Sequence, residues 1–190
     1  MYFYDLGHDY FDWLRKYFQK VGIVPLLCQI NCLGNELAIF YMIFESICGK
    51  TFRAVLAMMI ALSIRLATRV VTFVPHTSDG LWTIPENTPY FFSLPEKYDT
   101  FFSARIVVST ILLCECIYKA KSCLHKDMTF HKIKKLAIAA LSVILFILNV
   151  VNIVALRTSW SFDIIVSVIV ARYSTIIAYR YAPFIDAFSP

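Results

Sequence analysis

Five long apolar runs separated by polar connections constrain this chain more than any other feature. They cover residues 23–48, 54–73, 101–117, 136–156 and 162–181. A helix of about 20 mostly apolar residues spans the roughly 30 Å hydrocarbon core of a bilayer. The sequence therefore predicts an all-α fold, a polytopic transmembrane bundle of five spans that forms a single domain over residues 1–190.

The composition excludes a water-soluble globular domain. Hydrophobic residues make up 59% of the chain and charged residues only 16%, and the mean hydropathy is +0.65, so a wetted surface cannot be built. The net charge of +5 comes with lysines that concentrate in one connection rather than along one face. We therefore expect membrane orientation, and no nucleic-acid partner, to explain the basic balance.

Residues 1–20 have the pattern of an amphipathic helix in the membrane interface. Large apolar side chains recur there at spacings of three and four, and acidic and basic residues fill the positions between them. The apolar positions are Phe3, Leu6, Tyr10, Trp13, Leu14, Tyr17 and Phe18, and the charged ones are Asp5, Asp9, Asp12, Arg15, Lys16 and Lys20.

Two charged connections predict the topology. Residues 74–100 are acidic and residues 118–135 are strongly basic, and short lysine-rich connections stay in the cytosol. The basic connection, with the turn at Lys50 and Arg53, is therefore expected on the cytosolic side. The acidic connection and the N-terminus are expected in the lumen or exterior, and the C-terminus in the cytosol. The acidic connection carries Asp79, Glu86, Glu96 and Asp99 against Lys97; the basic one carries Lys119, Lys121, Lys126, Lys132, Lys134 and Lys135 against Asp127.

Polar residues inside the apolar runs either bond to or pack against neighbouring helices, or they belong to a functional site. Asn35 and Glu36 fall near mid-depth of the first run, where Glu36 is either neutral and bonded to a neighbouring helix or part of a site. The six cysteines lie almost wholly in apolar runs without a CxxC pair or a histidine pattern. We expect them to be small core residues, and we expect no metal site and no cofactor.

In this topology, charged residues from the ends of four runs share the outer boundary. Arg65 and Arg69 are four apart on one helix face, where they either grip a substrate phosphate or snorkel to lipid phosphates. A membrane pocket needs residues that are distant in sequence and alike in depth. The candidate set is Arg65, Arg69, Asp99, Ser103, Arg105, Arg157, Ser159 and Asp163.

These residues also carry a family resemblance. Residues 99–106 (DTFFSARI) and 159–163 (SWSFD) stand in the order of the D-x-x-F-S-G-H-T and H-Y-x-x-D motifs. Residues 65–75 match R-x-x-T-x-x-V-T-x-x-P, and residues 9–12 (DYFD) are similar to a short F-F-D element. The chain thus resembles the sphingomyelin synthases, membrane relatives of the lipid phosphate phosphatases, over nearly its whole length and without the family's first span.

The resemblance implies a chemistry whose two histidines this chain lacks. In the family, one histidine attacks the phosphate of phosphatidylcholine, an aspartate orients it, a second histidine transfers protons, and ceramide accepts the phosphocholine. Position by position, Asp163 stands at the aspartate, Ser159 at the nucleophile and Arg105 at the acid–base residue. Arg105 cannot act as a base, because its pKa exceeds about 12. Ser159 would need a borrowed base, His76 or His8.

Three hypotheses follow. The first is a catalytically impaired relative that binds a phospholipid headgroup, ceramide or diacylglycerol, alone or as a homo- or heterodimer with an active relative. The second is an active phosphocholine or phosphoethanolamine transferase, or a lipid phosphatase, with altered residues. The third is a small channel or membrane scaffold. For the first we expect a Golgi, endoplasmic reticulum or plasma membrane location with the site facing the lumen or exterior, and its test is whether Arg105, Ser159 and Asp163 converge on one cavity.

Overall fold

Every described segment of regular structure is helical. The computed structural model describes residues 6–49, 51–71, 102–123, 129–156 and 160–187. The all-α prediction is confirmed for these residues. The helices are α1 (Leu6–Tyr10), α2 (Asp12–Val21), α3 (Val24–Gly49), α4 (Arg53–Val71), α5 (Ala104–Cys123), α6 (Thr129–Leu156) and α7 (Ser161–Asp186).

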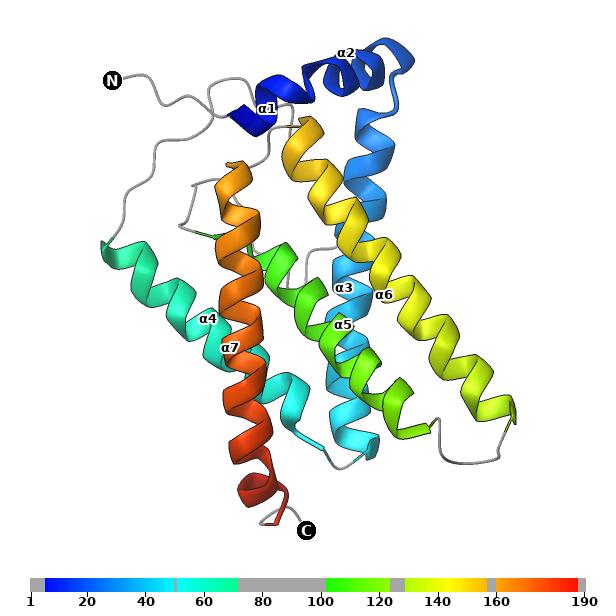
Figure 1. Cartoon of the computed structure of the whole chain (residues 1–190), viewed down its shortest axis with the longest axis vertical. Coiled ribbons are helices and arrows are strands. Elements are labelled where there is room, and N and C mark those ends of the chain that lie inside the picture. Colours follow the sequence, from blue (N-terminus) through cyan, green and yellow to red (C-terminus); the bar gives the residue numbers. More distant parts are fainter. Residues whose placement is uncertain (1–5, 50, 72–101, 124–128, 157–159, 188–190) are drawn as a thin grey trace.

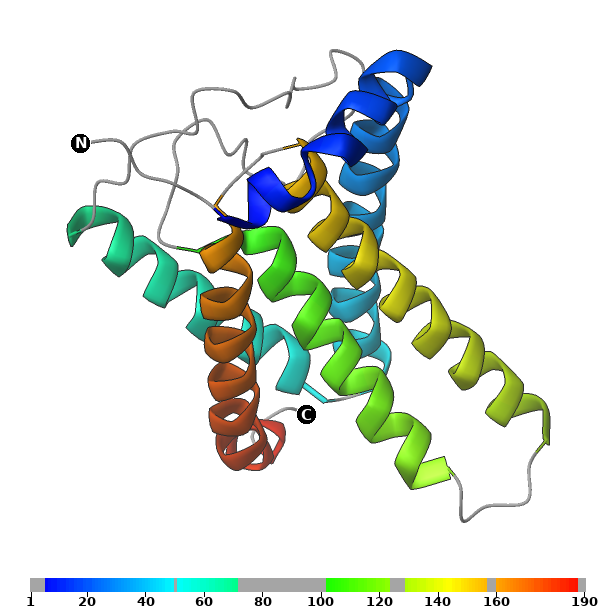
Figure 2. The ribbon, with the colours of Figure 1, turned by 45° about the horizontal axis from the view of Figure 1, so that its top comes forward.

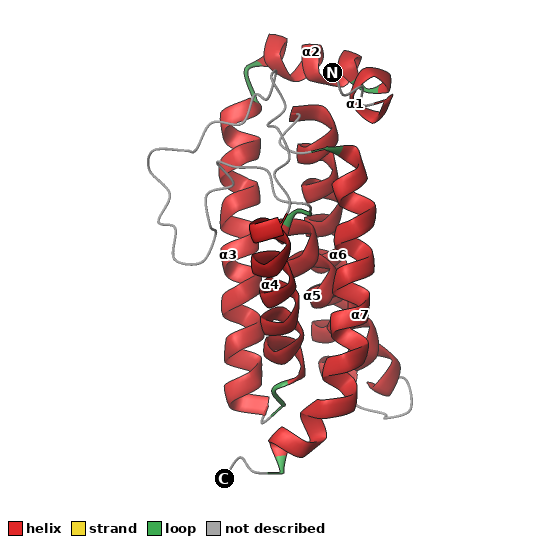
Figure 3. Cartoon of the chain, turned by 90° about the vertical axis from the view of Figure 1, so that its left-hand side faces the viewer, coloured by secondary structure: helices red, strands yellow, loops and turns green. Residues whose placement is uncertain are grey.

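Helices α3 to α7 form a bundle in which successive helices alternate in direction (Figures 1 and 3). α5 is central, because it packs against α3, α4, α6 and α7, and α4 packs mainly on α7. α1 and α2 lie across the end from which α3 starts (Figure 3). We call the end where α5 and α7 begin the Arg105 end, and the end where α5 stops and α6 starts the lysine end.

Within the part of the chain that the structure describes, three helices are long and apolar enough to cross a membrane. They are α3, the part of α6 from Ile133 to Leu156, and α7. This is the architecture expected of a membrane protein. α4 and α5 are not among these three, so the assignment of five spans stays a prediction.

The helix bounds depart from the predicted runs mainly at the lysine end. α5 continues to Cys123 and α6 already begins at Thr129, so much of the predicted basic connection is helical. Lysine and alanine are good helix formers, which lets a helix continue past its apolar stretch. α7 likewise runs through Pro183 to Asp186, beyond the predicted end at residue 181.

The N-terminal segment is two helices rather than one. α1 ends at Tyr10 and α2 begins at Asp12. Gly22 ends α2 with φ +72°, and its N–H donates to the carbonyl of Phe18 at 3.0 Å. Glycine adopts this left-handed backbone without a steric penalty. The chain can therefore turn sharply from α2 into α3.

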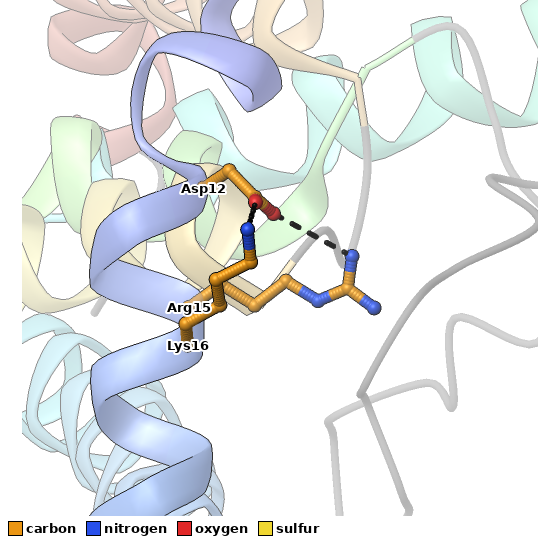
Figure 4. Close-up of polar contacts among 3 residues, drawn as sticks. All are labelled: Asp12, Arg15 and Lys16. Atoms are coloured by element: carbon orange, nitrogen blue, oxygen red, sulfur yellow. Dashed lines mark ion pairs between the residues drawn. The ribbon is translucent and has the colours of Figure 1, made fainter.

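α2 has a charged side held by local ion pairs. The Asp12 carboxylate lies 2.8 Å from Lys16 Nζ and 3.9 Å from an Arg15 guanidinium nitrogen (Figure 4). The side chains of Trp13 and Tyr17 are exposed. An exposed aromatic face beside a charged one suits a membrane interface, and the interfacial position stays a prediction.

Small side chains allow the helices to approach closely. Ala57 and Ala61 on α4, and Ala171 and Ala178 on α7, are fully or almost fully buried. Small residues let helix backbones approach in membranes, where dispersion contacts drive association. Buried cysteines fill the core in the same way. These are Cys28, Cys32 and Cys116, whereas Cys48 is exposed.

Candidate functional site at the Arg105 end

The start of α5 is tied directly to the start of α7. The backbone N–H of Ser103 donates to Ser167 Oγ at 2.9 Å, and the Ser167 hydroxyl donates to the carbonyl of Asp163. Phe102 is 1% exposed and anchors the segment that leads into α5. Two stretches 60 residues apart in the family resemblance therefore meet in the fold.

Asp163 occupies the third position of α7 and caps it. Its Oδ2 accepts a hydrogen bond from the Trp160 N–H at 3.2 Å, and its own N–H donates to the Trp160 carbonyl at 3.0 Å. A carboxylate in the first turn also interacts favourably with the positive end of the helix dipole. The side chain is only 5% exposed, so its orientation is fixed by the helix start.

Arg105 is buried, and its backbone carbonyl accepts two hydrogen bonds from side chains. It is 8% exposed. Its carbonyl accepts hydrogen bonds from the Ser109 hydroxyl at 2.9 Å and from Asn149 Nδ2 of α6 at 3.4 Å. The first turn of α5 is thereby positioned by α6 as well as by α7.

Asn149 also belongs to a polar seam between α3 and α6. Asn35 Nδ2 donates to Asn149 Oδ1 at 3.0 Å, and Asn149 Nδ2 donates back to Asn35 Oδ1 at 3.2 Å. Asn35 Nδ2 also donates to the carbonyl of Asn31 at 2.7 Å. All three asparagines are buried, and buried amides persist only when they are hydrogen-bonded. We call Asn31, Asn35 and Asn149 the asparagine seam.

Sequence reasoning found only part of this seam. It singled out Asn35 and Glu36, which are both buried, but it missed Asn149. The signal was present, since Asn149 and Asn152 interrupt the most apolar run of the chain. Polar residues inside a membrane segment face the bundle and mark structural or functional contacts.

Arg65 is the second arginine of the candidate set that the structure describes. It is 7% exposed, and the Thr68 hydroxyl donates to its carbonyl at 3.0 Å. Burial of a guanidinium is costly unless partners compensate it. The burial favours protein partners over the snorkelling to lipid phosphates that the sequence left open.

Six side chains of the predicted site cannot be placed. Ser159, Arg157, Asp99 and His76 lie outside the described residues, as does the side chain of Arg69 in α4. The same holds for the side chain of His8 in α1. Of the three positions of the family's catalytic chemistry, the structure thus describes Arg105 and Asp163.

The lysine end holds a different polar cluster. The Arg53 guanidinium lies 4.6 Å from the ring centroid of Tyr118 and 5.0 Å from that of Tyr179, and the two rings are 4.9 Å apart. Beside it, Lys119 Nζ lies 2.7 Å from Glu45 Oε1. Cation–π and ionic contacts here join the ends of α3, α4, α5 and α7.

The Arg105 end is suited to anion binding rather than to proton transfer. A guanidinium keeps its proton at neutral pH and presents several donors that match phosphate. The residues that the structure describes contain no group of three or more histidine, cysteine, aspartate or glutamate side chains that could hold a metal ion. No protein-family model, curated protein or solved structure matches the chain. The resemblance to sphingomyelin synthases therefore rests on the residues quoted for it.

Proposed function

We propose that the chain is an integral membrane protein, related to the sphingomyelin synthases and catalytically impaired, that binds a phospholipid headgroup at the Arg105 end. The observation that carries this proposal is the burial of one charged residue at each of two adjoining helix starts, Arg105 at α5 and Asp163 at α7. They lie at the starts of helices joined by the hydrogen bond from Ser103 to Ser167.

Phosphate binding follows from the chemistry of these groups. Arg105 and Arg65 supply guanidinium donors, and the beginning of a helix adds backbone N–H groups and a positive dipole. Asp163 offsets part of the positive charge and caps the start of α7. The family's histidines supply acid–base assistance worth roughly 10²- to 10⁴-fold in rate, which arginine and serine do not replace.

The membrane arrangement of the proposal has five spans, α3 to α7. The alternating helix directions (Figure 1) and the three helices of sufficient length support it. The lysine end then faces the cytosol and the Arg105 end faces the lumen or exterior. The membrane is that of the Golgi, the endoplasmic reticulum or the cell surface.

The lipid partners are those of sphingolipid and phospholipid metabolism. The headgroup pocket takes a phosphatidylcholine-like lipid, and ceramide or diacylglycerol is the second apolar partner. Because the chain lacks the family's proton carriers, it acts through lipid binding or by pairing with an active relative. It is not proposed as the transferase itself.

The test uses the full chain in lipid nanodiscs. Native mass spectrometry would measure bound phosphatidylcholine for the unchanged protein and for Arg105→Gln. We expect a roughly 10-fold to 100-fold loss of affinity, because hydrogen bonds to charged groups contribute about 1.5–3 kcal/mol. Arg180→Gln, which makes the same substitution at an exposed position near the other end of α7, is the matched control and should bind normally.

Two results would overturn the proposal. If a folded Arg105→Gln variant bound phosphatidylcholine as well as the unchanged protein does, Arg105 would not form a headgroup site. If the unchanged protein transferred phosphocholine to fluorescent ceramide and the Ser159→Ala variant did not, the protein would not be catalytically impaired. Arg105→Lys, which keeps the charge without the planar fork, should bind at an intermediate level if the fold is intact.

A further inference from the structure

A groove opens between α3 and α6 on the side of the bundle away from α7. α6 crosses α3 toward the α2 end, and the two helices then separate (Figures 1 and 2). At the crossing, a Cβ on Gly34 would lie 2.7 Å from Leu145 Cδ1, so the helices touch there. Below the crossing, Leu112 of α5 lines the groove between α3 and α6. The cavity measures about 410 Å³.

The walls of the groove are apolar from floor to rim. Ala38 and Leu112 are buried, whereas Leu37 and Leu141 at the rims are 58% and 64% exposed. Both wall helices are long and apolar enough to cross a membrane, so the rims face hydrocarbon. The volume falls within the range of about 300–1,000 Å³ of small-molecule sites. An acyl chain matches this position and chemistry.

The groove becomes polar and charged toward the lysine end. Tyr41 and Ser142 line it toward the lysine end. One turn further along α3, Glu45 is ion-paired with Lys119. On α6, Lys134 precedes the lining residue Ile138 by four positions and therefore lies on the same face. Lys135 is its neighbour. Glu45 and Glu115 both act on Tyr41, and against these two carboxylates stand Lys119, Lys134 and Lys135, so the balance of charge at this mouth is positive.

We propose that this groove binds one acyl chain of an anionic phospholipid, whose phosphate lies at Lys134 and Lys135. The positive mouth favours an anionic headgroup over a zwitterionic one, since each basic residue near an anionic lipid surface strengthens binding roughly fivefold. The proposal requires that α3 and α6 cross the membrane. It does not depend on the headgroup pocket at the Arg105 end.

The experiment is photo-crosslinking of the full chain in nanodiscs. Phosphatidylglycerol and phosphatidylcholine would carry the same acyl chains with the same photoreactive group, and peptide mass spectrometry would locate the labels. We expect labels concentrated on the groove segments 30–41 and 138–148. Phosphatidylglycerol should give at least threefold more labelling there than phosphatidylcholine.

Two matched pairs of variants test the two halves of the proposal. Lys134→Gln with Lys135→Gln should abolish the preference for phosphatidylglycerol, whereas Lys16→Gln with Lys20→Gln on α2 should keep it. Leu141→Trp, at the groove rim, should reduce groove labelling at least threefold. Leu136→Trp, on the same helix outside the lining residues and similarly exposed at 69%, should not.

Three outcomes would overturn the proposal. The first is labelling spread evenly over all exposed helix faces, which indicates only surrounding lipid. The second is equal labelling by the two lipids, and the third is a second copy of the chain crosslinked across the groove. Arg105→Gln should leave groove labelling unchanged, so the failure of either lipid site is distinguishable from failure of the other.

Discussion

The two ends of the bundle hold most of their charged residues in different ways, although Glu115, next to Tyr179 at the lysine end, is also buried. At the Arg105 end, Arg105 and Asp163 are more than nine-tenths buried. The start of α5 is fixed by a hydrogen bond that Ser103 N–H donates to Ser167 of α7 and by one that Asn149 of α6 donates to the Arg105 carbonyl. At the lysine end, the Lys119 and Glu45 side chains are 20% and 35% exposed. Arg53 there rests on the faces of two tyrosine rings.

This difference contrasts a buried hydrogen-bonded network at the Arg105 end with partly exposed charge contacts at the lysine end. A buried hydrogen-bonded network fixes geometry and loses much when one member is removed. Exposed ion pairs and stacked cations contribute less, because water or lipid headgroups replace them. We therefore expect changes at the Arg105 end to alter stability more than equal changes at the lysine end.

The asparagine seam should produce the largest effect. Asn149→Leu removes the two hydrogen bonds with Asn35 and the bond to the Arg105 carbonyl. We expect a loss of about 1–3 kcal/mol in the free energy of unfolding, because Asn35 is left buried with fewer partners. Unfolding in mild detergent would measure it. Gln29→Leu, at an exposed position of α3, is the control, and equal losses in the two variants would contradict the contrast.

The stacked arginine at the lysine end should matter less. Arg53→Gln removes a cation from the faces of Tyr118 and Tyr179. The expected loss is about 0.5–2 kcal/mol, the range of cation–π contacts from exposed to desolvated sites. The same unfolding assay applies, with Arg180→Gln as the control at an exposed position of α7. A loss larger than that of Asn149→Leu would reverse the ranking of the two ends.

The ion pair between Glu45 and Lys119 should be weaker still. A double-mutant cycle with Glu45→Gln and Lys119→Gln should give a coupling free energy of about 0.2–1 kcal/mol, as for partly exposed pairs. The coupling should fall as salt is raised. A coupling that salt does not change would indicate a buried pair that salt ions do not screen, and it would weaken the distinction between the two ends.

The smallest effect is expected outside the bundle, on α2. Asp12 pairs with Lys16 one turn away (Figure 4), and such helix pairs contribute about 0.3–0.5 kcal/mol. Asp12→Asn should therefore lower the hydrogen-exchange protection of α2 amides roughly twofold. Lys16→Gln should do the same, and the double variant should lose no more than either. Additive losses would show that the pair is not coupled.

Much of the fold follows from local pattern, whereas the site follows only in part. The apolar runs predicted α3, α6 and α7 with bounds within a few residues at most ends. The predicted topology placed Arg105 and Asp163 at the same end of the bundle, where the structure also has them. It missed Asn149, although a polar residue inside so apolar a run was a signal, and it missed Ser167, because the sequence does not say which small polar residues of α7 face α5.

The groove shows the same limit more clearly. Gly34, Leu112 and Leu145 are unremarkable as sequence, and each lies in an ordinary apolar run. They form a cavity boundary because α6 crosses α3 at an angle, leaves it toward the lysine end, and exposes α5 between them (Figure 2). A crossing angle depends on how side chains of both helices interlock.

The sequence by itself determined that the described segments are helical, where the long apolar runs lie along the chain, and how the charges are spaced along each helix. These properties depend on hydrogen bonds and side-chain spacing within each helix. Only the tertiary structure decided that α5 occupies the centre, that the asparagine seam holds the start of α5, and that α3 and α6 leave a groove. These depend on the rotation and tilt of each helix against its neighbours.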